Sequence, residues 1–421
     1  MPLVSRSYQY QLVLLLASSQ ALAYISRVNL SVVGPTLIKS GHFTPAALGL
    51  LFSIFNWSFT VALLASGPFA DKVRARIAFP LGVGLWSLGT MLCGLTMQFV
   101  PLAFLRGLVG IGEGPMIPSG AQVIRENFPK EQRATIVGTF FSGNKIGLMV
   151  GIPLSSAVYV YAGWIGTFLI TGGIGLLWIV WWFAVYRTNT TAMVTAAGHP
   201  PSGIRWSTLL RYRTTWGIML GQAGYLYIYY VFATWLPGYL VLQRHMSIQT
   251  TGLVGIIPFL VGAICVVLGG WAGDHLIRQG YRVTRVRKGF AVGGLLAATI
   301  FTVLGAYAQD TTLAIALLTS AVGAMSLATA SVNSMPIDVA PPNIVSSLVS
   351  LQNFGGNVGG SFAPIITGLL ISASGNFAVP LLVTAGVALV FGCGSFGLIV
   401  GSLDRELSLS MLDGSKQDRT G

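Results

Sequence analysis

Apolar stretches about as long as a bilayer is thick recur along this chain. A helix needs about 20 apolar residues to cross the hydrocarbon core, and 53% of the 421 residues are hydrophobic while only 8% are charged. One soluble core cannot hold so many apolar side chains, so we predict an all-α, polytopic membrane protein. The twelve predicted spans lie at roughly 9–36, 47–70, 77–98, 101–125, 134–160, 165–186, 214–242, 250–272, 287–308, 311–336, 345–373 and 377–401.

Lys and Arg positions predict the orientation, because cytoplasmic loops retain these residues. With the amino terminus inside, nineteen of the 24 fall on the inner side, two fall outside and three lie within spans. The net charge of +13 therefore reflects topology and does not require a nucleic-acid partner. We expect both termini in the cytoplasm, six-helix bundles at 1–187 and 214–403, a cytoplasmic linker at 188–213 and a cytoplasmic tail at 404–421.

The first apolar stretch also has features of a signal peptide, since Arg6 precedes it and Ala21-Leu22-Ala23 is similar to a cleavage site. However, the apolar run continues to about Leu37. Removing residues 1–23 would leave eleven spans instead of two sets of six. We therefore interpret this stretch as the first span.

Matching patterns in the two halves indicate an internal repeat. Gly67-Pro68-Phe69-Ala70-Asp71 and Gly270-Trp271-Ala272-Gly273-Asp274 both read Gly-x-x-x-Asp at the end of a span and precede basic residues. Gly143-Asn144-Lys145-Ile146-Gly147 in the fifth span likewise matches Gly356-Asn357-Val358-Gly359-Gly360 in the eleventh.

Asp71 and Asp274 are predicted to act in gating and not in binding. Each lies at a cytoplasmic helix end near basic side chains, among them Arg74 and Arg278. Ion pairs at such positions can hold an inner gate shut.

Four charged residues lie inside predicted spans, where a charge costs about 3 kcal/mol or more: Arg27, Arg106, Glu113 and Lys145. Arg106 and Glu113 are seven residues apart and therefore face the same way, roughly 10 Å apart along a helix. Three cations and one carboxylate leave excess positive charge, which a wet cavity that receives an anion explains. The alternative is that Arg106 and Glu113 neutralise one another, with the other two bonded to backbone carbonyls.

These residues can be given roles. We assign Arg27 to a substrate carboxylate because its planar fork suits bidentate binding. Arg106 is either a second carboxylate contact or the partner of Glu113. Glu113 is the only carboxylate deep in a span, which makes it the proton carrier if a proton is co-transported. Lys145 as a second carboxylate contact would favour a dicarboxylate or an aromatic acid.

Other side chains can complete the cavity. Tyr225 and Tyr229 are four residues apart and share a helix face, and Tyr24 lies near Arg27. A packing or interfacial role for these tyrosines remains open. Asn144 is an amide in a glycine-rich stretch next to Lys145.

The six-plus-six spans, the central linker and the Gly-x-x-x-Asp-basic loop resemble the major facilitator superfamily over essentially the whole chain. Within it, several segments are similar to the anion:cation symporter family of sugar-acid, hexuronate, phthalate and vesicular glutamate transporters. The segments are Tyr24 to Ser31, Arg106 with Glu113-Gly114, Thr234 to Leu240, Val339 to Pro342, and Asn353 with Gly355 to Gly360.

The resemblance implies two pseudo-symmetric bundles that rock about a central site, with proton coupling at Glu113 and a substrate ligand at Asn353. The chain departs from the sugar-acid members at Ser26, where they often have an Asp that is a second proton site. A serine does not titrate in the working range, so the resemblance does not carry two-proton coupling to this chain.

Three classes of function follow. The first is an importer of an organic carboxylate anion by proton symport, with a uniporter or exchanger as its alternative. The second is an efflux antiporter, but Gly151 to Ser156 breaks the antiporter pattern Gly-Pro-x-x-Gly-Gly. The third is a sensor or membrane enzyme, for which we find no soluble domain and no nucleophile with a base. We expect no cofactor and no metal, and a monomer in a bacterial inner membrane whose partners are the anion, protons and lipid.

Overall fold

The computed structural model describes residues 6–128, 130–187, 209–340 and 345–403, and every regular element within these ranges is a helix. The first half contains α1 (Arg6–Lys39), α2 (Pro45–Val73), α3 (Ala75–Cys93), α4 (Phe99–Glu113), α5 (Met116–Asn127) and α6 (Lys130–Val185). The second half contains α9 (Arg213–Leu242), α10 (Ile248–Val254), α11 (Ile256–Arg278), α12 (Val283–Tyr307), α13 (Thr311–Val339), α14 (Val345–Ser374), α15 (Ala378–Val387) and the π-helix η2 (Ala388–Ile399). Most of the predicted linker and the predicted tail lie outside the described residues.

The described helices account for all twelve predicted spans. Eleven stretches are long and apolar enough to cross a membrane. One of them lies in α6, whose 56 residues cover the fifth and sixth predicted spans and bend at Gly163. Gly163 has φ 62° and ψ −161°, a conformation that needs glycine.

Three spans are each built from two helices. The fourth consists of α4 and α5, the eighth of α10 and α11, and the twelfth of α15 and η2. The break in the fourth span falls at Gly114-Pro115, where proline removes a backbone donor. Glu113 is therefore the last residue of α4 and lies beside a helix break.

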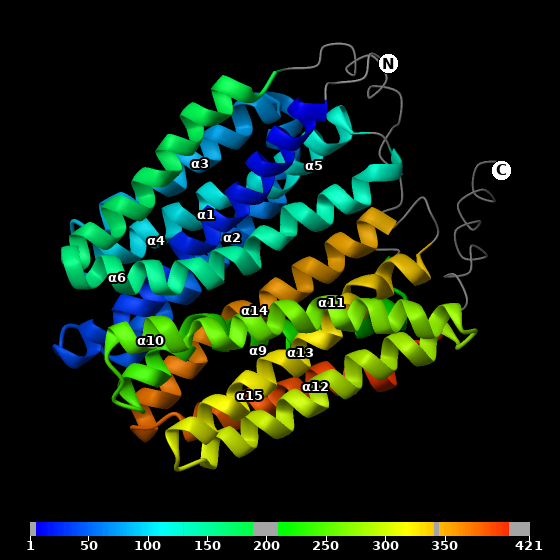
Figure 1. Ribbon diagram of the computed structural model, residues 1–421. Helices are drawn as coiled ribbons and strands as arrows, with labels where there is room; N and C mark the ends of the chain where they lie inside the picture. The colour runs from blue at the N-terminus through cyan, green and yellow to red at the C-terminus, as the bar shows by residue number, and fades with distance from the viewer. Residues whose placement is uncertain (1–5, 129, 188–208, 341–344, 404–421) are drawn as a thin grey trace, which may run out of the picture.

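The helices form two bundles, α1 to α6 and α9 to η2, which face each other (Figure 1). Large apolar side chains cover their outward faces; Phe104, for example, is 72% exposed and Val267 is 70% exposed. Apolar faces of this extent are typical of a protein whose surroundings are lipid.

The repeated glycine pattern packs the fifth and eleventh spans against the first helix of their own bundles. In the first bundle α6 lies along α1, and in the second α14 lies along α9. A Cβ atom on Gly147 would lie 2.5 Å from the carbonyl oxygen of Ala21 and one on Gly360 would lie 2.7 Å from the ring of Tyr230. Small residues at these positions let the helices approach closely.

Contacts between the bundles gather at the end where α1 finishes and α2 begins, called here the Lys39 end (Figure 1). Among the described residues, four hydrogen bonds join the bundles in this half of the molecule. Ser31 Oγ is shared between Thr234 O at 2.6 Å and Ala233 O at 3.3 Å, Ala46 N donates to Ser372 Oγ at 2.9 Å, and Ile365 N donates to Ser53 Oγ at 3.1 Å. The structure is therefore closed at the Lys39 end.

Candidate functional site

A pocket lies between the two bundles and contains an empty volume of about 400 Å³. Helices α1, α2, α4 and α6 line one side, and α9 lines the other. The first side includes Tyr24, Arg27, Phe55, Asn56 and Arg106, and the α9 side includes Tyr229, Tyr230 and Thr234. Both bundles therefore contribute side chains to the pocket.

Arg27 and Glu113 form an ion pair between α1 and α4. Arg27 Nε donates to Glu113 Oε2 at 2.8 Å and Nη2 donates to the same oxygen at 2.5 Å. Glu113 is fully buried, and its Oε1 atom has no hydrogen-bond partner among the described residues. The Arg27 guanidinium also lies 4.6 to 4.9 Å from the ring centroids of Tyr24, Phe55 and Phe59. Three aromatic rings therefore lie against the guanidinium of this ion pair, and Glu113 Oε1 remains an unused acceptor.

Arg106 lies on the same helix as Glu113 but is not its partner. Its side chain is 2% exposed, and its guanidinium lies 4.7 Å from the centroid of the Phe55 ring. Its Nε donor has no hydrogen-bond partner, and no carboxylate of the described chain lies within 4.0 Å of it. The structure therefore differs from the alternative in which Arg106 neutralises Glu113.

Lys145 approaches the pocket from α6. Its Nζ atom lies 5.0 Å from the centroid of the Tyr229 ring, a pocket wall on the opposite bundle. Leu148, three residues further along the same helix face, lines the pocket directly. No carboxylate of the described residues lies within 4.0 Å of the Lys145 ammonium group either.

The other predicted ligands divide into two groups. Tyr24 and Tyr229 line the pocket, and the buried Asn144 Oδ1 has no hydrogen-bond partner among the described residues. In contrast, the Tyr225 hydroxyl pairs with Thr329 Oγ1 at 2.7 Å, and Asn353 Nδ2 donates to Val349 O at 2.9 Å. Neither of these last two residues is among those that line the pocket.

Sequence reasoning did not select eight of the pocket residues, among them Phe55, Asn56 and Tyr230. Asn56 had a usable signal, because it is a polar residue inside an apolar span. Phe55 and Tyr230 had none, since aromatic residues in a span also face lipid or fill the core.

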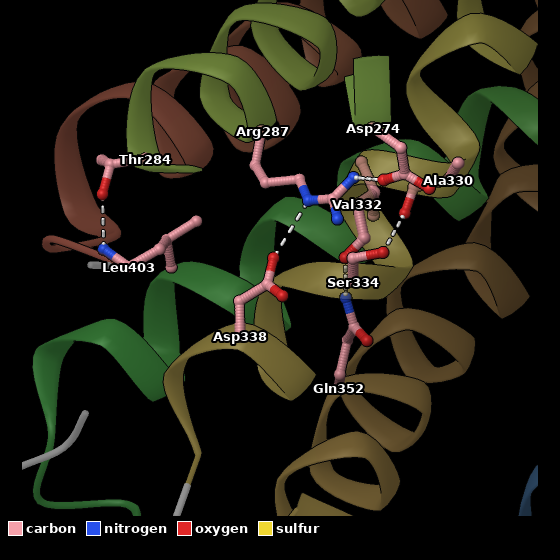
Figure 2. Close-up of polar contacts among 9 residues, drawn as sticks. All are labelled: Asp274, Thr284, Arg287, Ala330, Val332, Ser334, Asp338, Gln352 and Leu403. Carbon is pink, nitrogen blue, oxygen red and sulfur yellow. Dashed lines mark hydrogen bonds and ion pairs between the residues drawn. The ribbon is translucent and has the colours of Figure 1, made fainter. Parts of the chain in front are cut away.

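The predicted gating residue Asp274 pairs with a residue that sequence reasoning missed. Arg287 Nη1 lies 3.2 Å from Asp274 Oδ1, and Arg287 Nε donates to Asp338 Oδ2 at 3.0 Å. Figure 2 shows the guanidinium between the two carboxylates, which join α11, α12 and α13 within one bundle. The partner of Asp274 is therefore Arg287 and not the predicted Arg278.

The predicted gating residue of the first bundle, Asp71, has a side chain that lies outside the described part of the chain. Arg74 separates α2 from α3 and has a positive φ of 70°. Across the described ranges, no group of three or more His, Cys, Asp or Glu side chains is placed to hold a metal ion.

Comparisons with known proteins agree on the family. The sequence model of the Major Facilitator Superfamily matches residues 16–285. A probable L-galactonate transporter of Escherichia coli K12 is 31% identical over 395 residues, which cover 90% of this chain and 87% of that protein. A D-galactonate transporter of Escherichia coli O6:H1 is 29% identical over 423 residues, which cover 94% of this chain and 96% of the relative.

Solved structures share the fold. A bacterial homologue of the human lysosomal transporter Spinster has a TM-score of 0.81 at 18% identity and covers 94% of this chain and 97% of its own. A D-xylose-proton symporter has a TM-score of 0.76 at 14% identity, with coverages of 94% and 99%. Because the family model spans more than half of the chain and the relatives align along nearly all of it, the chain belongs to the Major Facilitator Superfamily and is a multi-pass membrane transporter, not an enzyme.

Proposed function

We propose that this transporter imports a small organic carboxylate anion together with a proton, by alternating access of a site between its two bundles. The observation that carries the proposal is the unpaired Arg106 on a pocket whose other arginine, Arg27, is bound to the single carboxylate Glu113. A buried guanidinium without an anionic partner is costly. An entering carboxylate would remove that cost, and bidentate binding by arginine would orient it.

The names of the relatives support the same substrate chemistry. The aligned proteins from Escherichia coli are named as transporters of galactonate, which is a sugar acid. The pocket of this chain offers hydroxyl and amide groups from Tyr24, Asn56 and Thr234 beside its arginines, so a hydroxylated or an aromatic acid can be accommodated.

Glu113 would carry the proton. Its carboxylate is the sole anionic partner of Arg27 among the described residues, so protonation of Glu113 would release Arg27 for the substrate. Substrate binding and protonation would then favour one another. This is positive linkage between two ligands, and it requires no direct contact between them.

Transport into proteoliposomes tests the proposal. The panel contains sugar acids, dicarboxylates and aromatic acids, each measured with and without an inside-alkaline pH gradient. We expect gradient-stimulated uptake by the wild type and its loss in Glu113→Gln. Exchange of internal for external substrate should persist in this variant, because exchange requires no net proton movement.

Glu126→Gln is the matched control. Glu126 accepts hydrogen bonds from Gln122 and Tyr186 and does not line the pocket, so gradient-driven uptake should persist. Uptake that responds neither to the gradient nor to Glu113→Gln would reject proton symport and indicate a uniporter or exchanger. Gradient-driven extrusion would instead support the efflux antiporter.

A further inference from the structure

The charges around the pocket do not balance, and the imbalance is larger than one unit. Three cations approach it, Arg27, Arg106 and Lys145, whereas Glu113 is the only carboxylate paired with any of them in the described chain. With Glu113 ionised, two positive charges remain without an anionic partner. Protonation of Glu113 raises the excess to three.

The two unpaired cations lie against aromatic rings from different walls of the pocket; Arg106 is among the lining residues, and Lys145 lies behind the Tyr229 ring. Arg106 projects from α4 and lies against the Phe55 ring, which lines the side formed by the first bundle. Lys145 projects from α6 and lies over the Tyr229 ring, which lines the side formed by α9. One carboxylate would therefore leave one of the two cations without a counter-charge.

We infer that the substrate is a dicarboxylate, with one carboxylate bound by Arg106 and the other by Lys145, and that Lys145 is the residue that selects diacids over monoacids. The inference rests on the proposed function and specifies its substrate class. A lysine ammonium on a flexible stem suits the second contact, because it can adapt to spacers of different length.

The unused acceptor of Asn144 adds an independent observation at the same place. Its Oδ1 atom is buried without a partner among the described residues, although buried polar atoms normally have one. Asn144 is adjacent to Lys145 and lies one helical turn before the pocket residue Leu148. A hydroxyl or a protonated carboxyl group of a ligand held by Lys145 can donate to it.

The competing explanation is that Lys145 only stabilises the fold through its contact with Tyr229. A cation–π contact contributes about 0.5–2 kcal/mol, so its loss would affect every ligand equally. If Lys145 selects the substrate, the loss of affinity in a Lys145 variant depends instead on the number of carboxylates in the ligand. The discriminating measurement is therefore a ratio of affinities between two acids that differ by one carboxylate.

We would measure binding to the purified full-length protein by isothermal titration calorimetry with two matched pairs, galactarate against galactonate and terephthalate against benzoate. The wild type should prefer the diacid in at least one pair. Lys145→Met should weaken binding of that diacid by roughly 10- to 100-fold, the loss expected for a hydrogen bond to a charged group, and leave the monoacid unchanged. Lys145→Arg should restore much of the preference.

Lys39→Met removes an exposed cation at the end of α1 and should leave both affinities unchanged. A wild type without a diacid preference, or a Lys145→Met variant that weakens both acids by one factor, would overturn the inference while the proposed function stands. A wild type that binds neither these acids nor any acid of the transport panel would reject the proposed function as well.

Discussion

The contact between α2 and α14 gives a prediction whose size can be worked from the structure. A Cβ atom on Gly49 would overlap the backbone carbonyl oxygen of Pro364 and lie 3.2 Å from the Cα atom of Gly368. Both obstacles are backbone atoms, which cannot rotate away as a side chain would. Gly49→Ala therefore forces the two helices apart at the Lys39 end.

The steric overlap created by Gly49→Ala destabilises only the state in which the Lys39 end is closed. Overpacking of a tight contact costs about 1–3 kcal/mol, which corresponds to a shift of about 5- to 150-fold in the ratio of the two states. The substitution should therefore increase the fraction of molecules that are open at the Lys39 end.

A cysteine in the pocket reports that fraction. Asn56 lines the pocket, so Asn56→Cys in a background without the three native cysteines can be labelled with a membrane-impermeant maleimide applied from the side of Lys39. We expect labelling to accelerate by the factor given above in Gly49→Ala. The control is Gly173→Ala, because Gly173 is also helical and its added Cβ would meet nothing within 4 Å.

Alanine gains about 1 kcal/mol of helix propensity over glycine at either position, so the comparison isolates the overlap with α14. Equal labelling rates for the two variants would refute the reasoning, since they would mean that this helix contact can relax at no cost.

Two further predictions concern the opposite end of the molecule and its orientation. Arg287→Met should lower the thermal unfolding temperature of the purified protein and leave substrate affinity unchanged. The substitution removes a largely buried ion pair with Asp338, whose side chain is 24% exposed. A hydrogen bond between charged groups of this kind contributes about 1.5–3 kcal/mol. Asp274→Asn should have a much smaller effect because that carboxylate is 62% exposed, and equal shifts for the two variants would contradict this account. The distribution of Lys and Arg predicts that an impermeant maleimide labels Lys39→Cys from outside intact cells and Arg282→Cys only after permeabilisation. The reverse labelling pattern would show that the predicted topology is inverted.

The fold could be predicted from the sequence because the bilayer imposes a length on every span. Hydropathy alone placed all twelve spans, even where one helix contains two of them, as α6 does. The glycine patterns of the fifth and eleventh spans indicated the repeat, and both pack against the first helix of their own bundle. These features depend on local composition and on spacing along the chain.

Side-chain pairing could not be predicted in the same way, because it depends on how the helices are rotated against each other. The spacing of Arg106 and Glu113 correctly places both on α4, but Glu113 pairs with Arg27 from a different helix. Arg287 is the first residue of the predicted span 287–308, whereas in the structure it lies within the first turns of α12 and pairs with two carboxylates. The sequence does not distinguish a charged residue that pairs inside the bundle from one in a loop when the residue lies near a predicted span boundary.

The distribution of charge between the bundles constrains how coupling can work. Arg27, Arg106, Glu113 and Lys145 all belong to the first bundle, while α9 presents Tyr229, Tyr230 and Thr234 to the pocket. If the bundles rock as rigid bodies, the distance between Arg27 and Glu113 does not change, so rocking alone cannot separate them. In the proposed function their separation must therefore come from a local event, either protonation of Glu113 or competition by a substrate carboxylate. The rocking motion would then follow from the neutralised charge and from contacts of the bound anion with α9.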